Sequence, residues 1–238
     1  MTQNKKIALV TGAGSGIGRA VALALLEDGF SLVLAGRRAE PLQAVVAQAL
    51  AAGGEALAVP TDVRDEQSVA QLFATIEEVH GRLDVIFNNA GINAPAVPVD
   101  ELPLENWRNV IATNVDGVFL CARAAFGLMR RQQPQGGRII NNGSISAHTP
   151  RPFTAPYTAS KHAVLGLTKA LAREVMRPET EALFISCSNF RTLDIIPALE
   201  AETGVPVITS NQAALWGTLR SLRDRRVVPG AGRLFQIS

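Results

Sequence analysis

The residues with the clearest chemical potential in this 238-residue sequence are Tyr157 and Lys161, which lie four positions apart. In a helix, this spacing places both side chains on one face. A free phenol has a pKa of about 10, too high for efficient proton exchange near neutrality. A nearby ammonium favours the phenolate and lowers such a pKa. Tyr157, the single tyrosine of the chain, is therefore a candidate acid-base group with Lys161 as its partner.

A serine precedes this pair at a useful distance. Ser144 lies thirteen residues before Tyr157 and directly after a predicted strand. Its hydroxyl is able to donate a hydrogen bond to a carbonyl or alcohol oxygen of a substrate. The alternative is that Ser144 caps a turn or a helix, because hydroxyl residues are common in such loops and Ser146 lies beside it.

A glycine-rich segment, residues 11–18, follows the first predicted strand and opens a helix with the pattern T-G-x-x-x-G-x-G. Glycine lets the backbone turn tightly and approach a pyrophosphate, whose charge is met by amides at the helix N-terminus. The alternative is a glycine-rich turn without a ligand. The position after the first strand favours dinucleotide binding, and the candidate residues are Gly12, Gly14, Ser15, Gly16, Ile17 and Gly18.

The end of the second predicted strand bears on the choice of nucleotide. An acidic residue at this point accepts hydrogen bonds from the ribose 2′-hydroxyl, whereas a cation accommodates a 2′-phosphate. Gly36 occupies the acidic position and Arg37 follows it, which favours NADP(H) over NAD. In the alternative interpretation, Arg37 and Arg38 form a solvated surface pair.

Short β-branched runs alternate with amphipathic stretches along the whole chain. The predicted strands are 7–10, 31–35, 56–59, 84–88, 138–142, 182–187 and 206–209. The predicted helices are 16–28, 41–52, 66–80, 104–131, 157–177, 193–202 and 211–222. This alternation predicts an α/β fold, a doubly wound parallel sheet of about seven strands in three α/β/α layers, with ligands at the carboxyl ends of the strands.

The motifs together, in this order, resemble the short-chain dehydrogenase/reductase family over about residues 5–173. They are the glycine-rich segment, Asp62-Val63, Asn88-Asn89-Ala90-Gly91, Ser144 and Tyr157-x-x-x-Lys161. The resemblance implies a Rossmann-like fold and hydride transfer between an alcohol or carbonyl substrate and a nicotinamide cofactor. It also implies that Asp62 and Val63 hold the adenine and that Asn89, Ala90 and Gly91 line the cofactor.

The resemblance further implies a catalytic tetrad of Asn114, Ser144, Tyr157 and Lys161. In the family, the serine polarises the substrate oxygen and the tyrosine exchanges its proton. The lysine also holds the nicotinamide ribose, and the asparagine supports a water that connects to the lysine. The bland alternative for Asn114 is that its amide satisfies backbone groups inside a helix pair.

After about residue 177 the pattern changes. Residues 181–235 resemble the C-terminal part of the aspartate/glutamate racemase superfamily, in particular its maleate isomerase and arylmalonate decarboxylase-like members. The matching segments are 182–187, 191–194 and 206–212, and the resemblance implies that Cys187 is a proton donor or nucleophile. Cys121 matches no such motif. We expect one domain, with residues 1–177 supplying the nucleotide-binding and catalytic part and residues 178–238 completing the sheet.

Composition excludes several classes of protein. A hydrophobic content of 47%, with 18% charged residues, fits a folded core, and a net charge of +2 does not favour nucleic acid. No long apolar stretch predicts a membrane span, and the polar N-terminus predicts no export signal. Two cysteines and three dispersed histidines favour neither a disulfide framework nor a metal site. We therefore expect a cytoplasmic protein, most simply a homodimer, without a metal.

The leading functional hypothesis is an NADP(H)-favouring oxidoreductase acting on a small alcohol or carbonyl. One alternative is a dinucleotide-binding protein with little turnover, because the unusual tail replaces the segment that covers the substrate. Another is an isomerase or decarboxylase that depends on Cys187.

Overall fold

The computed structural model describes residues 5–175, 183–185, 196–221, 224, 226–229 and 231–236. Five parallel strands form its main sheet in the order β3-β2-β1-β4-β5. Their bounds are β1 Ile7–Thr11, β2 Ser31–Gly36, β3 Ala56–Pro60, β4 Val85–Asn88 and β5 Arg138–Asn141. The order reverses between β1 and β4, which places a switch point, and the expected ligand crevice, at the ends of these two strands.

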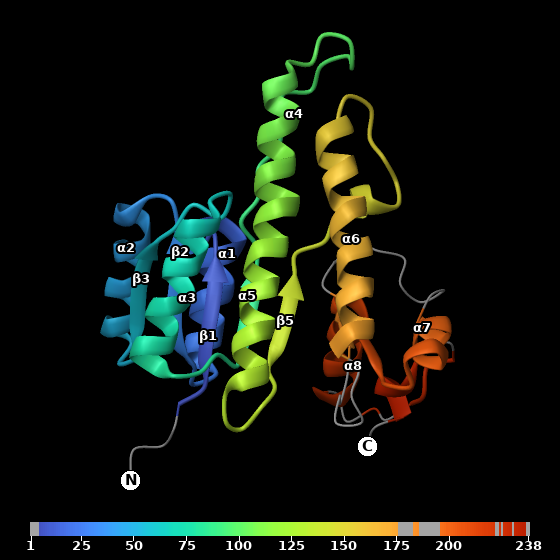
Figure 1. The fold of residues 1–238 in the computed structure, drawn as a ribbon. Coiled ribbons are helices and arrows are strands. Elements are labelled where there is room, and N and C mark those ends of the chain that lie inside the picture. Colours follow the sequence, from blue (N-terminus) through green and yellow to red (C-terminus); the bar gives the residue numbers. More distant parts are fainter. Residues whose placement is uncertain are drawn as a thin grey trace.

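Helices cover both faces of this sheet, as the alternating strands require (Figure 1). Side chains of α1 (Gly16–Glu27) and α2 (Ala39–Ala51) pack on one face, together with Val10 and Leu34. Side chains of α3 (Glu66–His80) and α5 (Gly117–Arg131) pack on the other, together with Leu9 and Val33. Adjacent residues of each strand thus point to opposite cores, which confirms the predicted three-layer arrangement.

The predicted helix 104–131 is a single column interrupted at its centre. It consists of α4 (Leu104–Ile111), a π-helical turn (Ala112–Asp116) and α5 (Figure 1). By length and composition this column is the one described helical stretch that could cross a membrane. The buried residues Cys121, Ala125 and Leu128 of α5 belong to the core, which accounts for its apolar character.

The prediction of about seven strands in a single sheet needs correction. The main sheet has five strands, and β6 (Leu183–Ile185) pairs in parallel with β7 (Val207–Thr209) in a separate sheet of two. Strand β6 lies next to β5, but its hydrogen-bonded partner among the described strands is β7. The tail also contains α7 (Ile196–Thr203) and α8 (Ser210–Ser221).

The tail has its own small core. Ala231, Leu234 and Phe235 are buried against Ile208 and Trp216. Beside them the buried carboxylate of Glu200 accepts hydrogen bonds from the main-chain N–H groups of Val207 and Arg233. Packing and hydrogen bonds within the tail therefore hold β7, α7 and the last turn together, beside β5 and below α6 in Figure 1.

Several predicted helix ends are confirmed by local chemistry. The Asp65 side chain caps α3 by accepting from the Gln67 N–H, and Gly81 ends that helix in the left-handed conformation. Gly53 behaves likewise at the end of α2, where it has a φ of +77°. The helix predicted to begin at residue 157 begins two residues earlier, as α6 (Ala155–Val175).

Candidate active site

The glycine-rich segment connects β1 to α1. Gly12 has a φ of +66°, and a Cβ added at Gly18 would lie 2.3 Å from the Gly12 carbonyl oxygen. Only glycine at position 18 therefore allows the first turn of α1 to approach the loop this closely. Ser15, Gly16 and Ile17 are exposed, with 62% of Ile17 accessible, and the first turn of α1 carries no acidic residue. The exposed helix N-terminus suits an anionic pyrophosphate.

The end of β4 is attached to this loop through Thr11. The Thr11 hydroxyl oxygen accepts from the N–H groups of Asn89 at 2.9 Å and Ala90 at 3.0 Å. The Asn89 side chain donates in return to the Thr11 carbonyl at 3.0 Å. These bonds hold Asn89 and Ala90 beside the glycine-rich segment, and Gly91 follows them in the chain.

Arg37 and Asp62 lie at the ends of β2 and β3. Arg37 is exposed, and its charge acts on Asp62. The pKa of Asp62 is lowered, chiefly because Arg64 donates hydrogen bonds to its carboxylate, the shortest at 2.6 Å. Val63 is buried, and its side chain packs so tightly on Gly117 that a Cβ there would lie 2.7 Å away. Asp62 and Val63 follow β3 (Ala56–Pro60), at the edge of the sheet formed by the carboxyl ends of the strands.

Tyr157 and Lys161 lie one turn apart on α6. The ammonium Nζ of Lys161 lies 5.5 Å from the centre of the Tyr157 ring. Lys161 is 7% exposed, and its Nζ donates a 2.7 Å hydrogen bond to the main-chain carbonyl of Asn142. An ammonium buried to this degree requires such a partner, and here it is held beside the phenol ring.

Asn114 lies in the π-helical turn, where the wider turn places its amide between two segments. Its Nδ2 donates to the Ile92 carbonyl at 2.9 Å and to Ser160 Oγ at 3.1 Å. Ser160 Oγ donates to the Tyr157 carbonyl at 2.7 Å. Asn114 therefore connects the loop after β4 to the turn of α6 that carries Tyr157 and Lys161. Its amide bonds to backbone groups, as the structural alternative for Asn114 predicted.

Ser144 follows β5 and begins a short 3-10 turn, Ile145–Ala147. Its side-chain oxygen accepts from the Ser146 N–H at 3.2 Å, so the predicted turn-cap geometry is present. The hydroxyl proton of Ser144 is left available for another acceptor by this bond. Ser144 lies two residues after Asn142, so one strand end supplies both the acceptor for Lys161 and the candidate hydroxyl.

Three residues of this site were missed by the sequence analysis: Thr11, Asn142 and Ser160. Thr11 and Ser160 lie inside the motifs, but their types alone indicate no role. Asn142 had a signal that was overlooked, since Asn-Asn pairs end both β4 and β5, at 88–89 and 141–142. Repeated amides at adjacent strand ends indicate side chains that bond across the sheet.

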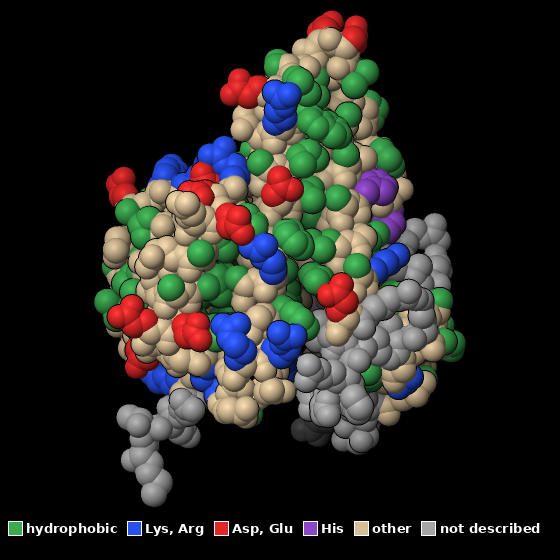
Figure 2. All heavy atoms as spheres, in the orientation of Figure 1, with side chains coloured by type: hydrophobic (Ala, Val, Ile, Leu, Met, Phe, Trp, Pro, Cys, Tyr) green, Lys and Arg blue, Asp and Glu red, His purple; other side chains and the backbone are tan. Residues whose placement is uncertain are grey.

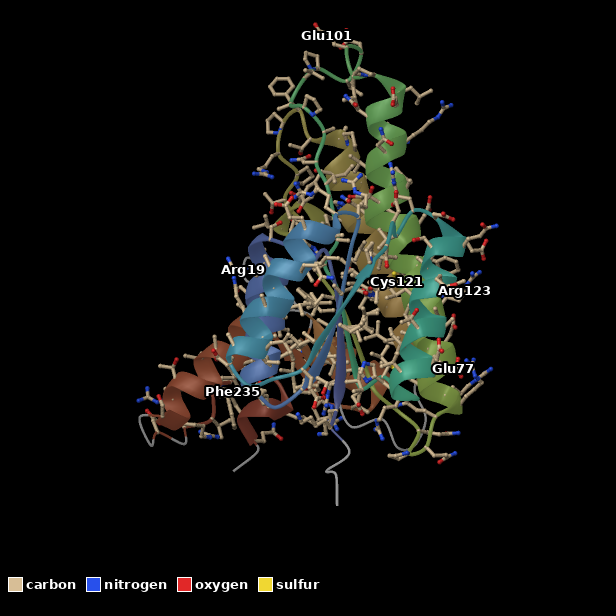
Figure 3. The ribbon with its side chains drawn as sticks, turned by 90° about the vertical axis from the view of Figure 1, so that its left-hand side faces the viewer. Arg19, Glu77, Glu101, Cys121, Arg123 and Phe235 are labelled. Atoms are coloured by element: carbon tan, nitrogen blue, oxygen red, sulfur yellow. The ribbon has the colours of Figure 1, made fainter. Side chains whose placement is uncertain are left out.

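The remaining candidates lie apart from this constellation. Burial raises the pKa of the Cys121 thiol to about 12, and Figure 3 shows Cys121 pointing into the core from α5.

His148 and His162 are exposed, with ring centres 6.5 Å apart. The pKa of His148 is lowered by partial desolvation of its ring and by the positive charges of His162 and Lys169. Cys187 lies outside the described residues, as do residues 191–194 of the tail resemblance.

Comparison with known proteins identifies the family. The model of the short chain dehydrogenase family matches residues 6–193, which is most of the chain. The chain therefore belongs to this family, as the motifs predicted, and its class is that of the family's oxidoreductases. A second family model, that of arylmalonate decarboxylase, matches residues 157–235 and confirms the similarity found in the tail.

Individual relatives agree with this assignment. A 3beta-hydroxysteroid dehydrogenase of Mediterraneibacter gnavus is 46% identical over 169 residues, which cover 71% of this chain and 60% of that protein. A 3-oxoacyl-[acyl-carrier-protein] reductase of Synechocystis is 42% identical over 171 residues, covering 71% of this chain and 68% of the relative. The matched part thus spans about three fifths to two thirds of these relatives.

Solved structures of the family share the fold. A metagenomic short-chain oxidoreductase in complex with NADP aligns with a TM-score of 0.72 and 33% identity, covering 78% of this chain and 85% of the other. A single-residue variant of actinorhodin polyketide ketoreductase with NADPH has a TM-score of 0.72 and 29% identity, covering 100% and 90%. Both were solved with the phosphorylated cofactor.

Proposed function

We propose that this protein is an NADP(H)-dependent oxidoreductase that interconverts an alcohol and a carbonyl in a small molecule. The observation that carries the proposal is the buried Lys161 ammonium, held one helical turn from Tyr157 at the carboxyl ends of the strands. General acid-base catalysis needs a proton-exchanging group held in place, and the hydroxyl of Tyr157 is such a group, with the Lys161 ammonium beside its ring.

Different residues of the chain bind different parts of the dinucleotide. The exposed first turn of α1 and the close-packed glycines bind the pyrophosphate, and Asp62 and Val63 hold the adenine. Asn89, Ala90 and Gly91 line the remaining length of the crevice beside Thr11. A nicotinamide bound in this crevice would supply or accept the hydride.

Proton transfer is assigned to the reacting end. Ser144 donates a hydrogen bond to the substrate oxygen, and Tyr157 gives its hydroxyl proton to that oxygen or takes one from it. Lys161 lies beside the Tyr157 ring and would hold the nicotinamide ribose. Asn114 supports the turn of α6 that carries Tyr157 and Lys161, through its hydrogen bond to Ser160.

We propose NADP(H) rather than NAD as the preferred nucleotide. Arg37 is exposed directly after β2 and follows Gly36, so no carboxylate competes with a 2′-phosphate at this position. The NADP-bound and NADPH-bound structures that share the fold support the same preference.

We further propose a single catalytic domain that acts in the cytoplasm as a homodimer. Side chains of the α4–α5 column leave apolar groups exposed, with Leu104 at 59% and Phe119 at 44%, and Figure 2 shows apolar side chains along this face. A second copy packing on this column would cover them. Light scattering of the purified protein measures the expected mass of two chains.

The test of the function combines binding and turnover. NADPH fluorescence is titrated with the parent, and a panel of ketones and aldehydes is screened for NADPH oxidation. Tyr157→Phe is expected to retain NADPH binding and to lose turnover, because the aromatic ring remains and the hydroxyl group that exchanges the proton is removed. Lys161→Ala is compared with Lys169→Ala, an exposed lysine of the same helix, and only the first is expected to lose activity.

Three results would contradict the proposal. Binding of NADPH without reduction of any carbonyl would leave a dinucleotide-binding protein with little turnover. Unchanged turnover in Tyr157→Phe would remove the acid-base assignment. Isomerase or decarboxylase activity that is lost in Cys187→Ser would transfer the function to the tail, where the arylmalonate decarboxylase similarity lies.

A further inference from the structure

Four asparagines form two cross-strand pairs at the carboxyl ends of β4 and β5. Asn88 Nδ2 donates to Asn141 Oδ1 at 2.9 Å, within the buried part of the sheet. One position further along, Asn142 Nδ2 donates to Asn89 Oδ1 at 3.0 Å. The first pair joins the last residues of the two strands, and the second joins the residues just beyond them.

Both pairs reach α6, but they do so through different atoms. In the first pair, Asn141 Nδ2 donates to Thr168 Oγ1 at 2.9 Å, which attaches the middle of α6 to the sheet. In the second pair, the main-chain carbonyl of Asn142 accepts the 2.7 Å hydrogen bond from Lys161 Nζ. The first contact holds the helix, whereas the second holds the ammonium itself.

The second pair also continues toward the glycine-rich segment. Asn89, which accepts from Asn142, donates through its Nδ2 to the Thr11 carbonyl at 3.0 Å. A continuous chain of hydrogen bonds therefore runs from the end of β1 through Asn89 and Asn142 to Lys161. Each member is at least partly buried, so these bonds are formed in a region of low dielectric constant, where they are stronger than in water.

We propose that Asn142 is a positioning residue. It fixes the position of the Lys161 ammonium relative to the glycine-rich segment. The Asn142 N–H bonds to the Asn88 carbonyl at 3.0 Å, just beyond the last residue of β5. The side-chain bond to Asn89 fixes this residue from a second direction, at the point where the chain leaves the sheet. The orientation of the carbonyl that holds Lys161 thus depends on the Asn142 side chain.

This inference rests on the proposed function for its catalytic consequence, but not for its structural one. Asn142 acts through Lys161 and need not touch substrate. Loss of its amide would leave the lysine in place on α6 but less closely held, with its charge further from the phenol on average. Small displacements of a catalytic group lower the rate strongly, because proximity supplies a large part of the acceleration.

The test compares Asn142→Ala with Thr168→Val, a matched control that removes the contact of the other asparagine pair with α6. The first readout is independent of activity: acetylation of lysine amines by an N-hydroxysuccinimide ester, followed residue by residue by peptide mass spectrometry. In Asn142→Ala, Lys161 is expected to react several-fold faster than in the parent. Exposed Lys169 is the internal reference and should react at the same rate in all three proteins.

The second readout is kinetic. In Asn142→Ala we expect kcat to fall about tenfold. KM for the carbonyl substrate should change little, because Asn142 need not touch substrate. Thr168→Val should lose thermal stability without changing kcat or the reactivity of Lys161. Asn142→Thr, whose hydroxyl keeps a donor near Asn89, is expected to lie between Asn142→Ala and the parent in both readouts.

The outcomes separate the two proposals. Unchanged acetylation of Lys161 in a folded Asn142→Ala or Asn142→Thr protein would overturn the positioning role. Failure of both variants to fold would assign Asn142 to stability alone and would also overturn it. Faster acetylation of Lys161 in a protein whose parent reduces no carbonyl would support the positioning role while the proposed function fails.

Discussion

Asn114 brackets Ile92: its Oδ1 accepts from the Ile92 N–H at 2.8 Å, and its Nδ2 donates to the Ile92 carbonyl at 2.9 Å. One side-chain amide thereby satisfies both polar groups of a residue that lies outside any strand or helix. The amide thus makes the two hydrogen bonds to the Ile92 backbone that a neighbouring strand would otherwise make. The loop after β4 is consequently held against the π-helical turn, close to Tyr157.

Asn114→Ala is expected to lower the free energy of unfolding by about 1–3 kcal/mol, because it leaves the polar groups of Ile92 without their partner. Chemical denaturation measures this loss. Asn93→Ala, an exposed change one residue beyond Ile92, is the control and should remain within about 0.5 kcal/mol of the parent. Equal stability of the two variants would show that the hydrogen bonds between Asn114 and Ile92 do not contribute to the free energy of unfolding.

Two glycines are expected to respond in opposite directions to the same substitution. In Gly18→Ala the added methyl would meet the Gly12 carbonyl oxygen at 2.3 Å, so either the loop or α1 must shift. We expect a loss of about 1–3 kcal/mol in unfolding free energy and weaker NADPH binding. Fluorescence titration and thermal unfolding measure both effects.

Gly166→Ala provides the matched comparison. Gly166 lies in the interior of α6, is exposed, and has nothing within 4 Å of an added Cβ. Because alanine favours a helix interior over glycine, this variant should gain about 0.5–1 kcal/mol. A stabilised Gly18→Ala, or an unchanged affinity for NADPH, would contradict the close packing of the glycine-rich segment.

The sequence predicted those parts of the fold that follow from local periodicity. The five strands of the main sheet start within one residue of their predicted positions, because each is a short apolar run with β-branched residues between turn signals. Helix α3 was predicted at its observed bounds, since an aspartate cap and a terminal glycine define its two ends.

The parts that could not be predicted depend on contacts distant in sequence. No residue pattern distinguishes the π-helical turn at Ala112–Asp116 from the helices on either side, and its width is tied to the position of Asn114. The acceptor for Lys161 is a main-chain carbonyl, which every residue carries, so this contact leaves no signature in the sequence. Only the side-chain bond of Asn142 to Asn89 had a signal, in the two Asn-Asn pairs. The pairing of β6 with β7 likewise depends on packing within the tail.

Arg37→Asp is expected to reverse the cofactor preference. In the parent, NADPH should bind at least about tenfold more tightly than NADH, the value of one hydrogen-bonded charge pair. In the variant, the new carboxylate would repel the 2′-phosphate and accept from a ribose hydroxyl. Arg38→Asp is the control, because Arg38 precedes α2 as its N-cap, and should preserve the preference. Equal affinities for both nucleotides in the parent would contradict the assignment of Arg37.

Cys121 should make the stability of the protein fall at high pH. Desolvation raises the pKa of its thiol from 9.0 to about 12 in the folded protein, so above pH 9.0 the unfolded chain loses a proton that the folded one retains. The unfolding free energy contributed by this group is therefore fully present below pH 9.0 and is lost as the pH rises toward 12. The expected slope is about 1.4 kcal/mol per pH unit within this range.

Cys121→Ala isolates that contribution. The substitution removes a buried sulfur, which lowers stability by an amount that does not depend on pH, and it removes the titrating thiol. Urea unfolding of parent and variant at several pH values should therefore show the parent more stable below pH 9.0, with the difference shrinking as the pH rises. Other titrating groups cancel between the two proteins. A difference in unfolding free energy that stays constant up to about pH 10.5, well inside the interval of the thiol's shift, would contradict the burial of Cys121 between α5 and the sheet.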